Sequence, residues 1–234
     1  MALPTAALSL VVDSAPPETI SGQFRWNGAG PIDTAVRDGL TLSSETGRTI
    51  AARMSDVFLF SSIIAPAADA ALWQQRTRST SRTTYRLLAM DTMMFSINLA
   101  LTSIIKVSTR RARPYVHYCE GDPEFTDCES GSRDRSFFSG HSSSAFTGAS
   151  LVCAHQRLRG QTPLGRVECI GSLAIATSTA MLRIVAAKHY VSDVVLGGIV
   201  GALVGYFIPV YVFPRRLPMR LDLESAGPAQ RSYW

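Results

Sequence analysis

Charged residues are scarce in this chain of 234 residues, and lysine is the scarcest of them. Only 18 % of the residues are charged, below the roughly 25 % that is usual in soluble domains. This shortage disfavours an ordinary soluble surface. Despite a net charge of +5, the sequence contains no dense block of basic residues, which argues against a nucleic-acid-binding protein. Only Lys106 and Lys188 are lysines among 23 basic residues.

Cysteine is also rare, with four residues in the whole chain. Cys153 and Cys169 lie within apolar runs, so we expect them to be small buried side chains. Cys119 and Cys128 flank a polar loop. They would form a disulfide if that loop faces an oxidising compartment, and two free thiols are the alternative.

The N-terminus has no basic residues before its short apolar stretch and no clear cleavage site. The sequence therefore leaves a secretory signal open, and we place no membrane span there. Residues 1–30 are expected to form an irregular arm, 31–213 a single helical domain and 214–234 a polar tail. Within the domain, apolar residues at helical spacing over 33–54 predict an amphipathic helical segment.

Five longer apolar stretches each predict a helix. They cover residues 55–73, 87–105, 141–154, 167–185 and 191–213. Four of them approach the roughly 20 residues that cross a bilayer, so we predict an all-α fold, a polytopic membrane bundle of about five spans. Polar residues inside these stretches are costly in lipid unless they face the bundle, which keeps a compact soluble bundle as the alternative. These residues are Asp56, Asp69, Asp91 and Asn98.

Arginines cluster in alternate connections between the stretches, which allows the topology to be predicted. The clusters are Arg76, Arg78, Arg82 and Arg86; Arg157, Arg159 and Arg166; and Arg215, Arg216 and Arg220. If every stretch crosses, all three lie on one side, which the positive-inside rule makes the cytoplasm. The cysteine loop then faces outward. We expect an integral membrane protein, of a bacterial inner membrane, whose polar site is extracytoplasmic.

The last stretch carries Gly197, Gly201 and Gly205 at a spacing of four residues. Small residues at this spacing permit close approach of helices. We expect a packing face within the monomer rather than a dimer interface, and the oligomeric state stays open.

Two polar clusters lie next to the predicted outward side, one on each side of the cysteine loop in the sequence. Lys106 and Arg113 are seven residues apart, so both could reach one anion from the same helix face. Ser139, Gly140 and His141 precede an apolar helical pattern. Free N–H groups and the positive dipole end of that helix would favour an anion. Alone, the first cluster also fits a membrane-interface anchor and the second an ordinary helix cap.

A third cluster contains Arg183, His189 and Asp193. On a helix, His189 and Asp193 would share a face, so the carboxylate could accept one imidazole N–H. The other ring nitrogen would then be free for nucleophilic attack. Arg183 would reach the same anion if the helix breaks near residues 186–187.

Together the three clusters resemble the type 2 phosphatidic acid phosphatase superfamily, which includes membrane lipid phosphatases, soluble bacterial acid phosphatases and vanadium haloperoxidases. The pattern of that family is Lys, six residues, Arg-Pro; then Pro-Ser-Gly-His; then Ser-Arg, five residues, His, three residues, Asp. Order and spacing match here over 106–193. Phe138 stands in place of the proline and Leu182 in place of the serine; neither position supplies an atom to the phosphoryl group.

The resemblance implies that His189 forms a phosphohistidine, that Asp193 orients it, and that His141 acts as general acid and then base. The residues that would hold the phosphoryl oxygens are Lys106, Arg113, Ser139, Gly140 and Arg183. No cofactor or metal is expected, because cationic side chains neutralise the transferring group. His117 and His155 are expected to have no role in the reaction. Lys188 would either lower the pKa of His189 or lie on a solvated rim.

The sequence therefore predicts a metal-independent phosphatase that hydrolyses a lipid phosphate or diphosphate, with the membrane and the lipid as its partners. A soluble secreted acid phosphatase acting on small phosphate esters is one alternative. A vanadium-dependent haloperoxidase is another, and a membrane scaffold with a degenerate site is the third.

Overall fold

The computed structural model describes residues 24–26, 28–77, 81–119, 121, 128 and 132–212. Most of the predicted arm 1–30 and the whole tail 214–234 lie outside these residues. The structure is 82 % helix and has no strand in its described part, which confirms the all-helical prediction.

The described part of the chain contains seven α-helices and one π-helical segment. They are α2 (Pro31–Leu40), α3 (Glu45–Thr77), α4 (Ser81–Thr109), α5 (Pro114–Cys119), α6 (Gly140–Arg159), α7 (Pro163–Val185), α8 (Val191–Ala202) and η2 (Leu203–Val212). Four helical units there are long and apolar enough to cross a membrane: α3, α4, α7 and the continuous α8–η2. These four long apolar helices fit an integral membrane protein.

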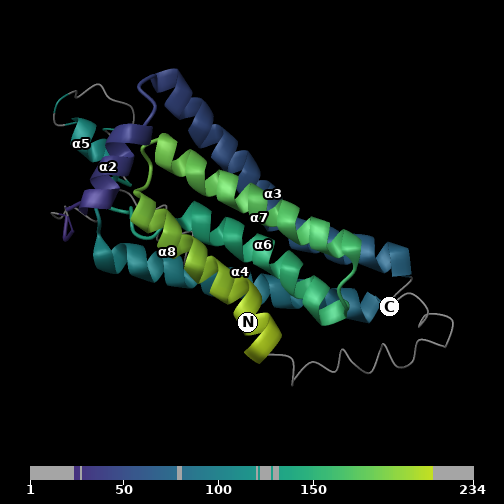
Figure 1. The fold of residues 1–234 in the computed structure, drawn as a ribbon. Coiled ribbons are helices and arrows are strands. Elements are labelled where there is room, and N and C mark those ends of the chain that lie inside the picture. The colour runs from purple at the N-terminus through teal and green to yellow at the C-terminus, as the bar shows by residue number, and fades with distance from the viewer. Residues whose placement is uncertain are drawn as a thin grey trace.

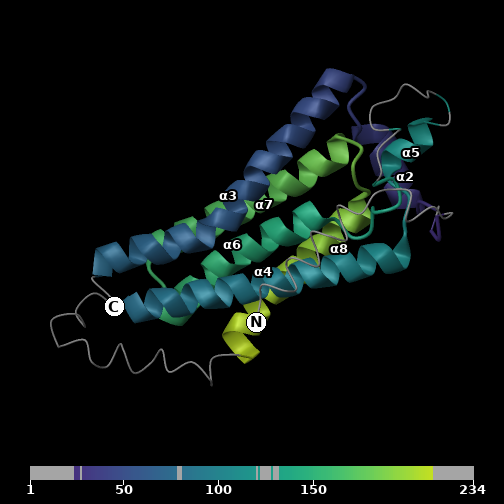
Figure 2. The ribbon, with the colours of Figure 1, turned by 180° about the vertical axis from the view of Figure 1, so that it is seen from behind.

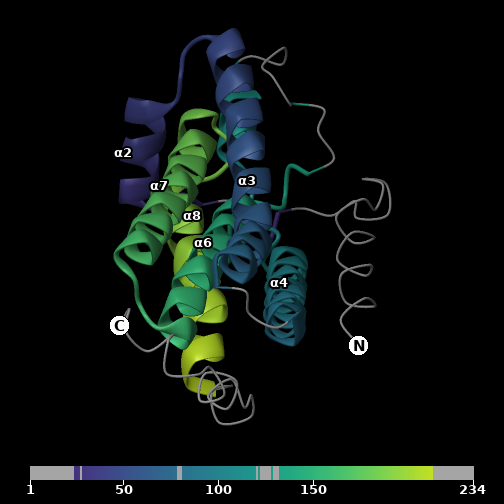
Figure 3. The same ribbon diagram turned by 90° about the vertical axis from the view of Figure 1, so that its right-hand side faces the viewer.

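Helix α6 lies at the centre of the bundle. It packs against α3, α4, α7, α8 and η2, and these helices surround it when the bundle is viewed from one end (Figure 3). Its composition explains this position, because Ser, Ala and Gly dominate the sequence of α6 and small side chains allow close packing. Its polar hydroxyls are satisfied inside the bundle: Asn98 of α4 donates to Ser143 and Ser144.

The glycines of the last helix contact α6 directly. A Cβ atom added at Gly201 would collide with the carbonyl oxygen of Ser143, and one at Gly205 with that of Thr147. The predicted packing face within the monomer is therefore confirmed.

Different elements lie at the two ends of the bundle, and an apolar surface lies between them. Helices α2 and α5 lie together at one end (Figure 1), and the α6–α7 turn lies at the other, as the reverse view also shows (Figure 2). Between the ends, large apolar side chains point outward; Phe60, Ile170 and Phe207 are each more than half exposed. An apolar outer belt of this kind suits contact with lipid.

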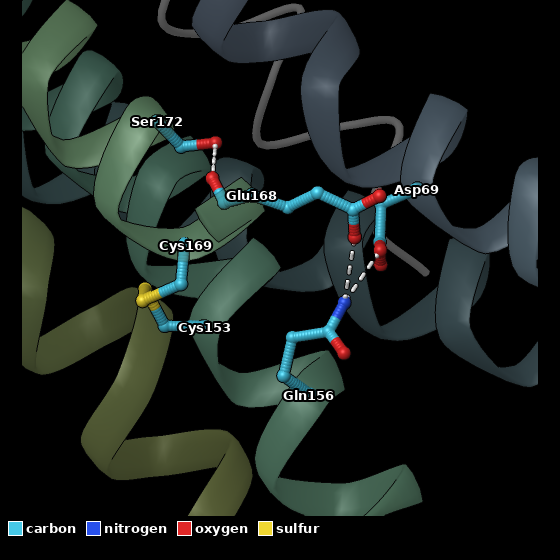
Figure 4. Close-up of a disulfide and its surroundings, with 6 residues drawn as sticks. All are labelled: Asp69, Cys153, Gln156, Glu168, Cys169 and Ser172. Carbon is cyan, nitrogen blue, oxygen red and sulfur yellow. Dashed lines mark hydrogen bonds between the residues drawn. A yellow bond between two sulfur atoms is a disulfide. The ribbon is translucent and has the colours of Figure 1, made fainter. Parts of the chain in front are cut away.

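The four cysteines form two disulfides. Cys119 is bonded to Cys128, with Cα atoms 5.7 Å apart, and Cys153 to Cys169, with Cα atoms 4.7 Å apart. The prediction of two separate buried side chains for Cys153 and Cys169 is wrong. Because α6 and α7 are antiparallel and joined by a short turn, residues about two helical turns from that connection face each other (Figure 4).

Candidate functional site

Four helix ends meet beneath α2 and α5: the C-terminal ends of α4 and α7 and the N-terminal ends of α6 and α8. The first cluster begins at the end of α4, the second lies at the start of α6, and the third extends from the end of α7 to the start of α8. Folding thus brings together residues that are up to 87 positions apart in the sequence, from Lys106 to Asp193.

The connection between α7 and α8 places His189. Helix α7 ends at Val185, so the helix breaks where the sequence predicts. Ala187 has a φ of 55°, in the left-handed region that non-glycine residues seldom adopt. The N–H groups of Lys188 and His189 both donate to the Arg183 carbonyl, at 3.0 and 3.3 Å. This turn brings Arg183 back toward the histidine.

His189 precedes α8, which begins at Val191, so it does not lie on the same helix as Asp193. Its side chain is only 2 % exposed. Nδ1 donates to the Ser136 carbonyl oxygen at 2.9 Å, whereas the nearest Asp193 oxygen is 3.7 Å from Nδ1. A carbonyl oxygen can only accept, so the proton is on Nδ1 and the lone pair is on Nε2. Sequence reasoning missed Ser136, since a backbone carbonyl leaves no signal in a side-chain pattern.

Positive charge surrounds this histidine. Burial, together with the cations Arg113, Arg183 and Lys106, holds the pKa of His189 well below its usual range. His189 is therefore a neutral imidazole at physiological pH. Lys106 reaches the start of α6, where a Cβ atom added at Gly140 would lie 3.2 Å from its Nζ.

Ser139 caps helix α6. Its Oγ accepts a hydrogen bond from the Ser142 N–H at 3.3 Å, and its own N–H donates to the Asp193 carbonyl at 3.0 Å. The second and third clusters therefore contact each other through the backbone. The free N–H groups of the first helical turn lie at the same point.

His141 is held by a residue that the sequence reasoning did not assign to the site. Its Nε2 lies 2.7 Å from Oδ1 of Asp56 in α3. Arg183 approaches the same oxygen at 3.5 Å and donates to the Ser55 hydroxyl at 3.1 Å. In the sequence, Asp56 was only a polar residue within an apolar stretch, and its side chain is 49 % exposed here.

Asp193 contacts groups other than the imidazole. Oδ2 accepts from the Ser136 hydroxyl at 2.5 Å and from the Tyr190 N–H at 2.9 Å. Oδ1 accepts from Arg111 at 2.5 Å. Arg111 in turn contacts Asp33 of α2 at 2.6 Å. Neither Arg111 nor Asp33 belongs to the three sequence clusters.

A cavity of about 330 Å³ adjoins the cluster and shares Arg113 with it. Its walls are Ala29, Thr34, Arg37, Ala112, Arg113, Val116, His117 and Tyr190. His117, expected to have no role, thus lines this cavity. Lys188 lies over the ring of Tyr115, with Nζ 5.6 Å from the ring centroid.

In the described part of the chain, no three His, Cys, Asp or Glu side chains form a group that could hold a metal ion. The polar groups that converge on His189 are mainly nitrogen donors. Such a set is suited to binding an anion.

The family model described as PAP2 superfamily matches residues 87–217, more than half of the chain. The match includes every residue of the three sequence clusters and leaves out α2 and α3. No curated protein matches the sequence.

Proposed function

Because this chain belongs to the PAP2 superfamily, we propose that it is a membrane phosphatase that cleaves a lipid phosphate or diphosphate through a phosphohistidine. Membership implies phosphatase-type activity, and the apolar helices suggest a phosphate ester associated with a membrane. One observation supports the proposal most: a neutral, buried His189 lies among Lys106, Arg113 and Arg183 at the end of this bundle.

In the first step, Nε2 of His189 attacks phosphorus in line and the bond to the leaving oxygen breaks. The cations, with Ser139 and the Gly140 N–H, neutralise charge on the three phosphoryl oxygens. His141 is held by Asp56 through Nε2. It starts this step as the imidazolium, with a proton on both ring nitrogens, and donates the Nδ1 proton to the leaving oxygen. The products are the dephosphorylated lipid and a phosphohistidine.

In the second step, the same His141 is neutral and accepts a proton from water as that water attacks phosphorus. The P–N bond to His189 breaks, phosphate leaves and the imidazole returns to its neutral form. Asp193 contributes by holding Ser136, whose carbonyl fixes the tautomer of His189.

The position of the site suits an amphiphilic substrate. The cluster lies where the apolar helices meet the polar region of α2 and α5, so a phosphate could enter it while the lipid tail remains beside the bundle. The adjoining cavity carries Arg37, Arg113 and His117, and could hold further polar parts of the head group.

For the membrane arrangement, we propose that 31–213 is one helical domain with five crossings, in which α6 crosses inside the other four. The predicted 33–54 segment is divided between α2 and the first turns of α3. This part would lie at the extracytoplasmic interface of a bacterial inner membrane, beside the site. The described arginines at the opposite end, among them Arg76, Arg157 and Arg166, support a cytoplasmic location for that end.

Phosphate release by detergent-solubilised protein tests this function. Wild type and His189→Ala would be compared, with EDTA, on phosphatidate, a polyprenyl diphosphate and p-nitrophenyl phosphate. We expect release from a lipid substrate that survives EDTA and falls at least about 10³-fold in the variant. Gly171→Ala in α7, where nothing lies within 4 Å of an added Cβ, is the control variant.

Trapping makes the intermediate visible. Brief reaction with a ³²P-labelled lipid should give acid-labile, alkali-stable label on wild type and none on His189→Ala. Equal release from the variant, or no release from any substrate, would contradict the proposal. Vanadate-dependent halide oxidation by the same preparation would instead identify a haloperoxidase.

A further inference from the structure

Arg111 is a fully buried charge outside the family pattern. Its side chain is 1 % exposed. Nη1 donates to Asp193 Oδ1 at 2.5 Å and to the Ser192 hydroxyl at 2.8 Å, and Nη2 donates to Asp33 Oδ2 at 2.6 Å. A buried guanidinium of this kind is retained only where its hydrogen bonds and counter-charges are supplied.

Two aromatic rings fix the plane of this guanidinium. Its Cζ lies 4.1 Å from the ring centroid of Trp26 and 4.4 Å from that of Tyr190. Tyr190 follows His189 directly and caps α8. The position of Arg111 is therefore coupled to the turn that carries the histidine.

Asp33 links α2 to Ser192 at the start of α8, beside Arg111. Its Oδ1 accepts from the Ser192 N–H at 2.9 Å, and its Oδ2 accepts from the Ser192 hydroxyl at 2.7 Å. Asp33 is the buried residue of α2. Helix α2 lies outside the matched residues 87–217, so this chain adds a contact to the site that the family model does not include.

The charges in this group do not cancel. One guanidinium lies between two carboxylates, Asp33 and Asp193, which leaves one negative charge in excess beside His189. When Nε2 of His189 bonds to phosphorus, its ring keeps the Nδ1 proton and becomes cationic. Asp193 Oδ2, 3.7 Å from Nδ1, is close enough to stabilise that cation in a buried site.

We propose that Arg111 and Asp33 are positioning residues for the phosphohistidine reaction. Arg111 holds Asp193, and through Ser136 the tautomer of His189, while Asp33 supplies the excess negative charge that stabilises the cationic ring. This inference rests on the proposed function and adds α2 to the reacting unit.

Several charged groups determine the pH at which His189 takes up a proton, and with it the acid limb of kcat. Some act on His189 directly: Lys106 from α4, Arg113 from the α4–α5 connection, His141 from α6, Arg183 from α7 and Asp193 from α8. Others are joined to it through a partner: Arg111 from the α4–α5 connection and Asp33 from α2 through Asp193, and Asp56 from α3 through His141. Lys188 is next to it in the sequence. Changing one buried charge of this set should move the acid limb of kcat in a direction set by the sign of that charge.

The test therefore compares two neutralising variants with opposite expected shifts. Asp33→Asn removes negative charge, so protonation of His189 becomes harder and the acid limb should move down by about one pH unit. Arg111→Gln removes positive charge, so the limb should move up by a similar amount. Both should lower kcat about tenfold or more with KM within about twofold, because Lys106 and Arg183 still bind phosphate.

Asp134→Asn is the matched control, because it breaks the neighbouring Arg110–Asp134 ion pair of 2.9 Å and Asp134 is not among the charges that shift the pKa of His189. It should leave kcat and the acid limb unchanged. If Arg111→Gln does not fold, Arg111→Lys replaces it. That variant keeps the charge without the two-sided contact, and should lower kcat without moving the limb.

The outcomes separate the two proposals. Active variants with wild-type kcat and an unmoved limb would overturn the positioning role alone, as would shifts of the same sign in Asp33→Asn and Arg111→Gln. Wild-type protein without phosphatase activity would overturn the proposed function and this inference together. An Asp33→Glu variant whose acid limb of kcat lies at the wild-type pH would support the inference.

Discussion

At the scale of residues, His189 depends on neighbours that keep it neutral and oriented. Its Nδ1 proton is held by the Ser136 carbonyl, and burial together with nearby cations opposes a second proton. A nucleophilic imidazole must have its lone pair available, which requires the neutral form. In the proposed reaction the same cations would bind the phosphate, so they would add to the effect of burial on His189 and also bind the substrate.

This arrangement predicts the pH dependence of the proposed reaction. A protonated His189 cannot attack, and its pKa in the folded protein lies well below the usual 6.5. As the pH falls through 6.5, kcat should therefore persist, and it should decrease only at much lower pH. Measuring kcat against pH on p-nitrophenyl phosphate or a soluble short-chain lipid phosphate checks this. An acid limb centred at or above 6.5 would contradict it.

The residues of the site differ in how far they could be predicted. Lys106, Arg113 and the third cluster could be predicted because side-chain type and fixed spacing are visible in the chain. Ser136 and Arg111 could not, because one acts through a carbonyl and the other through partners 78 and 82 positions away. In the sequence, Asp56 is only a polar residue that would be costly in lipid. Its contact with His141 exists because α3 lies beside α6 in the fold.

At the scale of elements, α6 shows how low hydropathy can mark the interior of a membrane bundle. It is the central helix although it is not among the four apolar units. Helix existence could be predicted from apolar length, but this central position could not, because it follows from side-chain size and hydroxyl pairing across helices. The cysteine pair of α6 and α7 was missed for the same reason, since apolar pattern carries no information on which helix faces which.

Because α8–η2 approaches α6 closely, adding a methyl group should lower stability at a glycine of this contact and leave it unchanged at a glycine outside it. Gly201→Ala would place Cβ against the Ser143 carbonyl, so overpacking should cost about 1–3 kcal/mol of stability. Gly171→Ala in α7 is the matched control, because nothing lies within 4 Å of its added Cβ; it should be neutral or slightly stabilising. Thermal unfolding in detergent measures both, and equal melting temperatures would contradict the packing argument.

At the scale of the whole molecule, buried polar groups hold the end of the bundle opposite the site. His155 of α6 lies between Asp69 and Asp91, with contacts of 2.8 and 2.9 Å. Arg159 contacts Asp69 at 2.6 Å, and Gln156 donates to Asp69 and to Glu168 of α7 (Figure 4). These contacts join α3, α4, α6 and α7. Intramembrane polar residues therefore face one another, as their cost in lipid requires.

The two disulfides lie on opposite sides of this arrangement, and they allow the proposed topology to be tested. Cys119–Cys128 is at the site end, whereas Cys153–Cys169 joins α6 and α7 near the arginine-rich end. If the site is extracytoplasmic, a membrane-impermeant reductant followed by an impermeant maleimide should label Cys119 and Cys128 in intact spheroplasts. Cys153 and Cys169 should be labelled only after detergent is added. The Cys119→Ser/Cys128→Ser variant should lose the label added from outside, and the Cys153→Ser/Cys169→Ser variant should keep it. Labelling of Cys153 from outside would contradict the proposed orientation, because the arginine-rich end would then face the exterior.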